Sequence, residues 1–385
     1  MHTLDQYYRG TIVACRYSLP SSLAHREALW VLKNKVYNAI SLGIIGENSK
    51  DPVFVRLDHL DLHNHVDWKS FDDFNDLESH HLATQPGWRV IVLHKIEADY
   101  LEVLDLSDCS NTLPPNPELL SNWPMYATWA PIQVTPYATR RHTFTVNKDT
   151  ITKVVSVCHQ QNTTLTGLLH GLTLVSLTRA VEEAKGFASR TPYDLRHFLP
   201  SNTPAYPRLQ PKETLCNYVS VVDHEFDAEL VALIRSTVPQ GGVNTSLPAE
   251  TMDIIWSVSA RVRREIKARL GSGMNNDMIG IMKFVRDWRP QQESEARKPR
   301  YLSWLVTNLG VLDGDAPKTQ QDEGAKVPSA VLSVSVMTVK DEQMCVTCTW
   351  QDCVVDTNLA KGLMGDLERW LNEVASQCRC NRSNR

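Results

Sequence analysis

The chain has 385 residues, of which 42% are hydrophobic and 22% charged, and its formal net charge is −4. This length suits two domains of ordinary size, and the composition is typical of a folded protein rather than a disordered one. The small net charge gives no electrostatic reason to expect nucleic acid as a partner. No apolar run is long enough to span a bilayer, and no secretory signal is visible at the start. The nine cysteines then indicate reduced thiols and a cytoplasmic location.

The first third of the chain is predicted to contain four strands and one helix. Alternating or continuous apolar residues predict the strands, and a Pro-Ser-Ser start predicts the helix. The strands are expected at 10–19, 52–62, 88–93 and 100–106, and the helix at 23–40. A polar, acidic loop is expected at 67–85.

A Pro-rich segment at 111–136 separates the two halves of the chain. Such a run cannot hold a long helix, because proline lacks an amide hydrogen and clashes with the preceding turn. The domain boundary is therefore placed near residue 145, which gives an N-terminal half of residues 1–145 and a C-terminal half of residues 146–385.

The C-terminal half is organised around a helix at 165–183. Thr163 and Thr164 can cap its start, and apolar residues surround it, so the helix is expected to be buried between layers. A short strand is expected to carry Asp194-Leu195-Arg196. Further helices are expected at 151–161, 227–238, 246–270, 278–288 and 359–374, and strands at 217–223, 304–309, 331–339 and 344–350.

Four stretches of sequence carry a resemblance to a known family. They read Pro-Gly-Trp-Arg-Val-Ile-Val-Leu at 86–93, Arg-Thr-Pro-Tyr-Asp-Leu-Arg-His-Phe-Leu-Pro at 190–200, Trp-Leu-Val-Thr-Asn-Leu-Gly at 304–310 and Thr-Trp-Gln-Asp at 349–352. Together they resemble fungal alcohol O-acetyltransferase-like members of the acyltransferase and condensation-domain superfamily, over nearly the whole chain. The resemblance implies a two-domain α/β fold of the chloramphenicol-acetyltransferase type, with helices packed on mixed sheets.

The resemblance also implies a chemistry. In this superfamily a His-x-x-x-Asp motif supplies a histidine that acts as general base on an acceptor hydroxyl, for which an imidazole with a pKa near neutrality is suited. The hydroxyl of a small molecule then attacks an acyl-CoA such as acetyl-CoA. We therefore expect a monomeric transferase of fungal secondary metabolism with acyl-CoA as co-substrate and no bound cofactor.

The remaining expected site residues also follow from the resemblance. The family's motif aspartate pairs with an arginine from the other half, and Arg196 best matches that arginine. His197 beside it should face the domain interface together with Asp194. Asn308 and Gly310 should form a polar turn at the same interface.

The motif itself is missing at the place where the family carries it. No histidine occurs between His94 and His142. His63 and Asp67 match the spacing alone and are kept as the candidate catalytic pair. Two alternatives stay open: a family member that lost the motif and binds or cyclises a small molecule, or a shortened, inactive gene product.

Three further expectations concern single residues. Without a motif aspartate, Arg196 must pair with another acid, be hydrated through an opened cleft or leave a weakened core; Asp194, Asp105 and Asp108 are the candidate acids. His170 in the central helix is expected to be a satisfied core residue. Cysteines 345 and 348 have zinc-knuckle spacing, but they lie on an expected strand where such positions face opposite sides, so no metal site is expected.

Overall fold

The computed structural model describes the backbone alone in one part of the chain, and the backbone with side chains in another. Six strands within residues 11–107 are described by their backbone, and residues 126–132, 139–199, 218–238, 246–274, 277–279, 288–312 and 330–377 are described further. The chain divides into two compact units, the first built mainly from Met1–Asn111 and the second from most of the remainder. The boundary at 145 stays a prediction, and strand β7 runs across that position.

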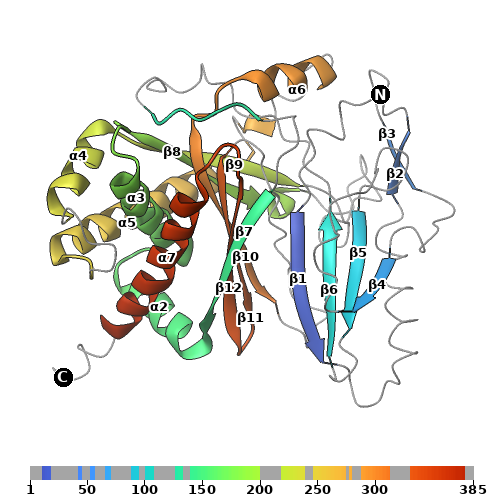
Figure 1. Cartoon of the computed structure of the whole chain (residues 1–385), viewed down its shortest axis with the longest axis horizontal. Coiled ribbons are helices and arrows are strands. Elements are labelled where there is room, and N and C mark those ends of the chain that lie inside the picture. Colours follow the sequence, from blue (N-terminus) through green and yellow to red (C-terminus); the bar gives the residue numbers. More distant parts are fainter. Residues whose placement is uncertain are drawn as a thin grey trace. The chain divides into compact units, whose positions relative to one another are not determined.

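The first unit contains a four-stranded sheet and a separate strand pair. The strands are β1 Thr11–Ser18, β2 Leu42–Ile45, β3 Val53–Arg56, β4 Val66–Ser70, β5 Trp88–His94 and β6 Tyr100–Ser107. The sheet has the order β1-β6-β5-β4, while β2 pairs with β3 (Figure 1). The strands expected at 10–19, 88–93 and 100–106 are confirmed, and the one at 52–62 is shorter. The helix expected at 23–40 lies outside the described residues.

The expected acidic loop at 67–85 is wrong at its start. Val66–Ser70 forms strand β4, which pairs in parallel with β5. Val66 and Trp68 alternate with Asp67 and Lys69, which is the period of a strand, but the acidic composition of the segment hides this short signal. Asp67 therefore lies within a strand.

The second unit is a six-stranded mixed sheet. Its strands are β7 Thr139–Asn147, β8 Phe187–Asp194, β9 Val219–Phe226, β10 Leu302–Leu312, β11 Leu332–Val339 and β12 Gln343–Gln351, in the order β7-β12-β11-β10-β8-β9. β10 runs parallel to β8 and to β11, and the other neighbours are antiparallel. The buried strand expected at 304–309 is confirmed, because Trp304, Leu305 and Val306 are almost completely buried.

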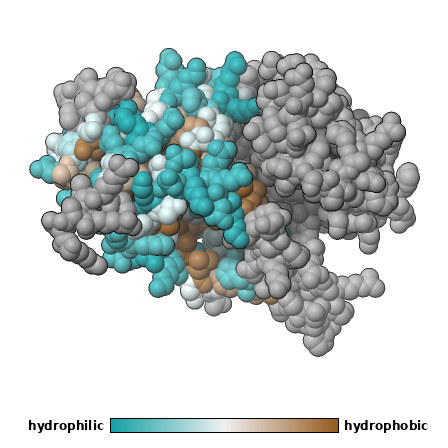
Figure 2. All heavy atoms as spheres, turned by 90° about the horizontal axis from the view of Figure 1, so that it is seen from below, coloured by the Kyte–Doolittle hydropathy of each residue, from teal (hydrophilic) through white to brown (hydrophobic). Residues whose placement is uncertain are grey.

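The helices of the second unit are α2 Lys148–Gln160, α3 Leu165–Ala180, α4 Ala228–Thr237, α5 Ala249–Gly271 and α7 Thr357–Gln377, and α6 Trp288–Arg297 spans the two units. Figure 1 shows α2, α3, α4, α5 and α7 together on one side of the six-stranded sheet. None of the described helices is long and apolar enough to cross a bilayer. The face shown in Figure 2 is largely hydrophilic where residues are described. The α/β class with helices packed on a mixed sheet is confirmed.

Helix α3 is the centre of this layer, as the sequence predicts. Every residue from Gly167 to Thr178 is buried, and the Thr164 hydroxyl caps the start by accepting the Gly167 N–H. The helix ends at Ala180 with Val181 as its C-cap, three residues before the expected end at 183. α3 packs against α5 on one side and α7 on another. Apolar residues can therefore occur all round this helix, because none of its faces is in contact with solvent between Gly167 and Thr178.

Replacing Gly167 with alanine tests the close approach of α3 and α5. A Cβ at Gly167 would lie 2.5 Å from the Ser259 carbonyl oxygen and 2.6 Å from the Thr163 hydroxyl. Alanine favours a helix, but this clash involves backbone, so we expect a net loss of about 1–3 kcal/mol in the free energy of unfolding. Urea unfolding measures the change. Gly365→Ala in α7, where a Cβ meets nothing within 4 Å, should be neutral or stabilising; equal effects of the two variants would contradict the packing argument.

One expected element of this unit needs correction, and another lies mostly outside the described residues. Strand β8 ends at Asp194, and Arg196 begins a single turn of 3-10 helix, Arg196–Phe198, so Asp-Leu-Arg does not lie within one strand. The Asp194 carboxylate accepts the Arg196 backbone N–H at 3.1 Å, and this local bond turns the chain. The helix expected at 278–288 lies mostly outside the described residues, and α6 begins where it should end.

Candidate functional site

A continuous chain of hydrogen bonds crosses the core of the second unit, and we call it the His170–Glu265 chain. Trp304 Nε1 lies 3.0 Å from His170 Nδ1, and His170 Nε2 lies 2.9 Å from the Thr191 hydroxyl. That hydroxyl is 2.9 Å from His224 Nε2, and His224 Nδ1 is 2.6 Å from a Glu265 carboxylate oxygen. The five residues come from α3, α5 and strands β8, β9 and β10.

The direction of each hydrogen bond in this chain follows from its end at Trp304. An indole N–H can only donate, so His170 Nδ1 accepts and the proton of the neutral ring is on Nε2. His170 then donates to Thr191, whose hydroxyl donates to His224 Nε2. His224 in turn donates from Nδ1 to the Glu265 carboxylate. Every member is satisfied, which is the condition under which a buried polar network stabilises a unique core.

The prediction that His170 is a satisfied core residue is confirmed. The ring is fully buried, and the Ser189 hydroxyl lies 2.9 Å from Nδ1 as a further partner. Burial, and to a lesser degree the neighbouring His224, holds the pKa of His170 well below its usual value of 6.5. His170 is therefore neutral throughout the range in which an exposed histidine titrates.

Acid should destabilise the protein through His170. Because the unfolded chain takes up a proton near pH 6.5 that the folded His170 refuses, the free energy of unfolding falls as pH drops below about 6.5, by up to about 1.4 kcal/mol per pH unit. Urea unfolding between pH 7.5 and 5 measures this slope. His170→Asn should flatten it, whereas the exposed His159→Asn should not. An unchanged slope in His170→Asn would contradict the assignment.

Three members of the His170–Glu265 chain follow one another as the residues of a catalytic triad do. Glu265, His224 and Thr191 place a carboxylate, an imidazole and a hydroxyl in sequence. However, Thr191 is 5% exposed and His224 is fully buried, while the Glu265 side chain is 35% exposed. The arrangement orients two rings and links them to one surface carboxylate.

A buried ion pair lies at the position next to Thr191 in β8. Arg190 is fully buried and donates from Nε and Nη2 to the two Asp223 carboxylate oxygens, at 2.6 and 2.8 Å. Tyr301 is a further hydrogen-bond partner of Arg190. Burial raises the pKa of the Tyr301 phenol, so it stays protonated. Because adjacent residues of a strand face opposite sides, this pair and the His170–Glu265 chain occupy the two faces of the sheet.

Of the three candidate acids for Arg196, the structure shows Asp194 as an ion-pair partner. Arg196 Nη1 lies 3.2 Å from an Asp194 carboxylate oxygen, and the guanidinium lies 5.4 Å from the ring centre of Tyr218. His197 is exposed and its ring packs against Phe198. Whether Asp194, Arg196 and His197 face a domain interface stays a prediction.

Asn308 and Gly310 form a local turn in β10. The Asn308 side chain accepts the Gly310 N–H at 2.9 Å and donates to the Thr166 hydroxyl at 3.3 Å. Gly310 has φ +81°, a left-handed conformation that favours glycine, and the pairing register with β11 shifts between Asn308 and Val311. These contacts explain the two residue types locally. Their expected interface role stays a prediction.

The candidate catalytic pair lies where the structure describes little. His63 is outside the described residues, and Asp67 is described only by its backbone pairing with Ile91 in β4 and β5. Asp105 lies in β6, and Asp108 is outside the described residues. The role of His63 and Asp67 therefore stays a prediction. Cysteines 345 and 348 lie on β12 as expected, the first half-buried and the second buried.

Sequence reasoning missed Thr191, His224 and Glu265 as members of a buried network. The one available signal was polarity within apolar strands: Thr191 follows Arg190 in β8, and His224 sits among valines and Phe226 in β9. Such residues need partners if they are buried. Their partners are distant in the sequence, however, and the sequence alone does not show which ones meet.

Over nearly its whole length the chain has the chloramphenicol-acetyltransferase-like fold of the acyltransferase and condensation-domain superfamily. The structure of TRI3 trichothecene 15-O-acetyltransferase from Fusarium sporotrichioides superposes with a TM-score of 0.66 at 8% identity, covering 96% of this chain and 91% of that one. The epimerization domain of the third module of tyrocidine synthetase B gives a TM-score of 0.53 at 11% identity, covering 99% and 94%. At such low identity these similarities establish the fold alone.

The chain is also similar in sequence to a probable alcohol acetyltransferase. The chain is 26% identical to the probable alcohol acetyltransferase FCK4 of Fusarium pseudograminearum, over 86% of this chain and 82% of that protein. No protein-family model matches the chain. The predicted resemblance to fungal alcohol O-acetyltransferase-like proteins is thus confirmed.

Proposed function

We propose that the protein is an O-acyltransferase that moves an acyl group from an acyl-CoA, such as acetyl-CoA, to the hydroxyl of a small molecule in fungal secondary metabolism. The observation that supports this most is the similarity to the probable alcohol acetyltransferase FCK4, which extends over 86% of the chain. The shared fold with TRI3, an acetyltransferase, agrees with it. No bound cofactor is required, since the acyl-CoA is itself the donor.

The activity is tested by incubating the purified chain with acetyl-CoA and a panel of small alcohols, with acetylated products measured by mass spectrometry. If His63 is the general base, His63→Ala should lower kcat/KM by about 10²–10⁴-fold, because that is what a positioned base contributes. The exposed His159→Ala is the control and should keep full activity. Turnover that survives His63→Ala would assign the base elsewhere, and no acetyl transfer at all would sink the proposal.

A second candidate is a family member without catalytic activity, either a small-molecule binder or a shortened product. Two observations support it. The alignment with FCK4 extends over 424 residues but includes only 86% of this 385-residue chain, about 331 residues, so roughly 93 positions of the alignment have no counterpart here. In addition, no histidine lies between His94 and His142, where the motif is expected.

The two forms of this second candidate are distinguished by the coding DNA between the codons of Val103 and Asn116. A frame-preserving intron there that encodes a His-His-x-x-x-Asp-Gly block would favour a shortened product. An uninterrupted coding sequence, together with ligand binding but no turnover, would favour the binding protein.

A further inference from the structure

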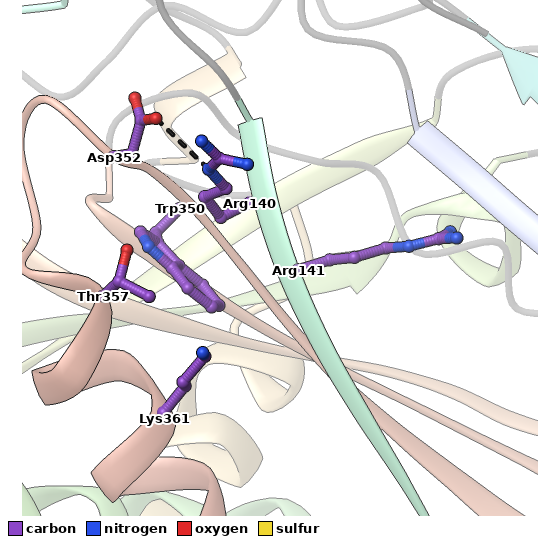
Figure 3. Close-up of a pocket in the computed structure, with 6 residues that line it drawn as sticks. All are labelled: Arg140, Arg141, Trp350, Asp352, Thr357 and Lys361. Carbon is purple, nitrogen blue, oxygen red and sulfur yellow. Dashed lines mark hydrogen bonds and ion pairs between the residues drawn. The ribbon is translucent and has the colours of Figure 1, made fainter. Parts of the chain in front are cut away.

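A hollow of about 290 Å³ lies on the second unit where helix α7 begins, and no role is assigned to it by the proposed acyl transfer. It is lined by Arg140, Arg141, Trp350, Asp352, Thr357 and Lys361 (Figure 3). The volume is at the lower end of ordinary small-ligand sites, which range from about 300 to 1,000 Å³. We call it the α7 hollow.

Secondary structure brings these side chains to the same place. Arg140 in β7 and Trp350 in β12 are directly paired residues of two antiparallel strands, so both side chains lie on the same face of the sheet. Thr357 and Lys361 are four residues apart in α7 and share one face of that helix. Figure 3 shows the Trp350 ring between Arg140, Thr357 and Lys361. Arg141, the neighbour of Arg140, extends to the other side of its strand.

The α7 hollow is lined by hydrogen-bond donors that have no acceptor among the described residues. Trp350 is 2% exposed, yet its indole Nε1–H is buried and has no hydrogen-bond partner among the described residues. Leaving such a group unmatched is unfavourable, and native proteins do so rarely. No side-chain hydrogen bond or ion pair to the described residues is seen for Thr357 or Lys361. Arg140 uses Nε alone to contact Asp352, at 3.2 Å.

We propose that the α7 hollow binds the phosphate group of a small ligand. Two cations, Arg140 and Lys361, match the charge of a phosphate monoester, and charge-assisted hydrogen bonds from such groups are among the strongest. The Thr357 hydroxyl supplies a further donor; the Trp350 N–H is not exposed to solvent in the free protein, so it can donate to an anion only if the surrounding side chains move. Asp352 holds the guanidinium of Arg140 in place through Nε, which leaves its two terminal nitrogens for an anion.

The site does not depend on the start of the helix alone. The Asp356 carboxylate already caps α7, because it accepts the Asn358 N–H at 2.7 Å. The helix terminus is therefore partly neutralised, and the argument rests on the side chains of β7, β12 and α7. The inference also does not rest on acyl transfer, so either can fail without the other.

Isothermal titration calorimetry on the full chain with inorganic phosphate as the probe tests this site. We expect saturable binding that weakens by about tenfold or more in Lys361→Met and in Arg140→Gln, since each variant removes a charge-assisted contact. Lys267→Met, an exposed lysine of α5, is the matched control and should bind like the unaltered protein.

Trp350→Phe separates a ligand contact from a structural role. The indole N–H has no hydrogen-bond partner among the residues that the structure describes, so its removal breaks no hydrogen bond seen there, and weaker phosphate binding in this variant reports the contact itself. Competition with coenzyme A and with its phosphate-free fragment pantetheine shows which ligand carries the phosphate group that the hollow binds. Displacement of phosphate by coenzyme A but not by pantetheine would assign the phosphate to the donor, and no displacement by either would assign it to another ligand.

The outcomes that overturn the proposal are absence of saturable phosphate binding to the unaltered chain, and binding that Lys361→Met and Arg140→Gln leave unchanged. Because both altered side chains are exposed, melting temperatures should stay near that of the unaltered protein, so lost binding cannot be ascribed to unfolding.

Discussion

Replacing Thr191 with valine is expected to lower the free energy of unfolding by about 2–6 kcal/mol, although the side chain keeps its shape. The hydroxyl accepts from His170 Nε2 and donates to His224 Nε2, and both rings are fully buried. Valine leaves one donor and one acceptor unmatched, at about 1–3 kcal/mol for each buried group. Urea unfolding at pH 7.5, where His170 is neutral in both states, measures the change.

Thr191→Ser is the matched control for this experiment. It retains the hydroxyl and loses one buried methyl group, so we expect a loss of about 1 kcal/mol. If valine and serine destabilise the protein equally, the hydroxyl does not connect the two histidines. A second check is His170→Phe in the Thr191→Val background, which removes one of the two unmatched groups. The double variant should lose less free energy of unfolding than the sum of the two single variants, since residues of one network couple.

Local signals in the sequence were enough to predict most of the second unit. Thr164 and Asp227 stand directly before helical apolar patterns, and both cap their helices through a backbone N–H three residues on. The spacing of Leu363, Leu367 and Leu371 predicts the buried face of α7, and all three are buried. These elements could be predicted because cap and period lie within a few residues of each other.

Elements without such signals were missed. Strand β7 contains Arg140, Arg141 and several threonines, and it lies at one of the two edges of its sheet. Only Phe144 and Val146 are buried in it. A pattern with so few apolar positions does not identify a strand until its partner β12 is known.

The candidate site was predictable only in part, because its contacts are long-range. Asp194 and Arg196 are two residues apart, and their ion pair could be proposed from the sequence. The His170–Glu265 chain, by contrast, joins five elements between residues 170 and 304. Which polar residues meet is fixed by the register of β8 with β9 and β10, and no local pattern encodes that register.

Replacing Arg190 with methionine should lower the free energy of unfolding by about 3–5 kcal/mol, within the range expected for Thr191→Val. Arg190 is fully buried and forms a two-point ion pair with Asp223, whose side chain is 15% exposed. Methionine fills most of the space, but it leaves a carboxylate in a largely apolar setting and removes a partner of Tyr301. Urea unfolding gives the size of the effect, and Arg263→Met on the exposed side of α5 should change stability by less than about 0.5 kcal/mol.

A double-mutant cycle separates loss of the pair from the cost of the charge left behind. Asp223→Asn in the Arg190→Met background removes the uncompensated carboxylate, so this double variant should be more stable than Arg190→Met alone. Burying two charges is itself unfavourable, and a pair replaced on both sides can be nearly neutral. A double variant that is less stable than either single one would mean that Arg190 and Asp223 act independently, and the ion pair would then not explain why a fully buried arginine is tolerated in β8.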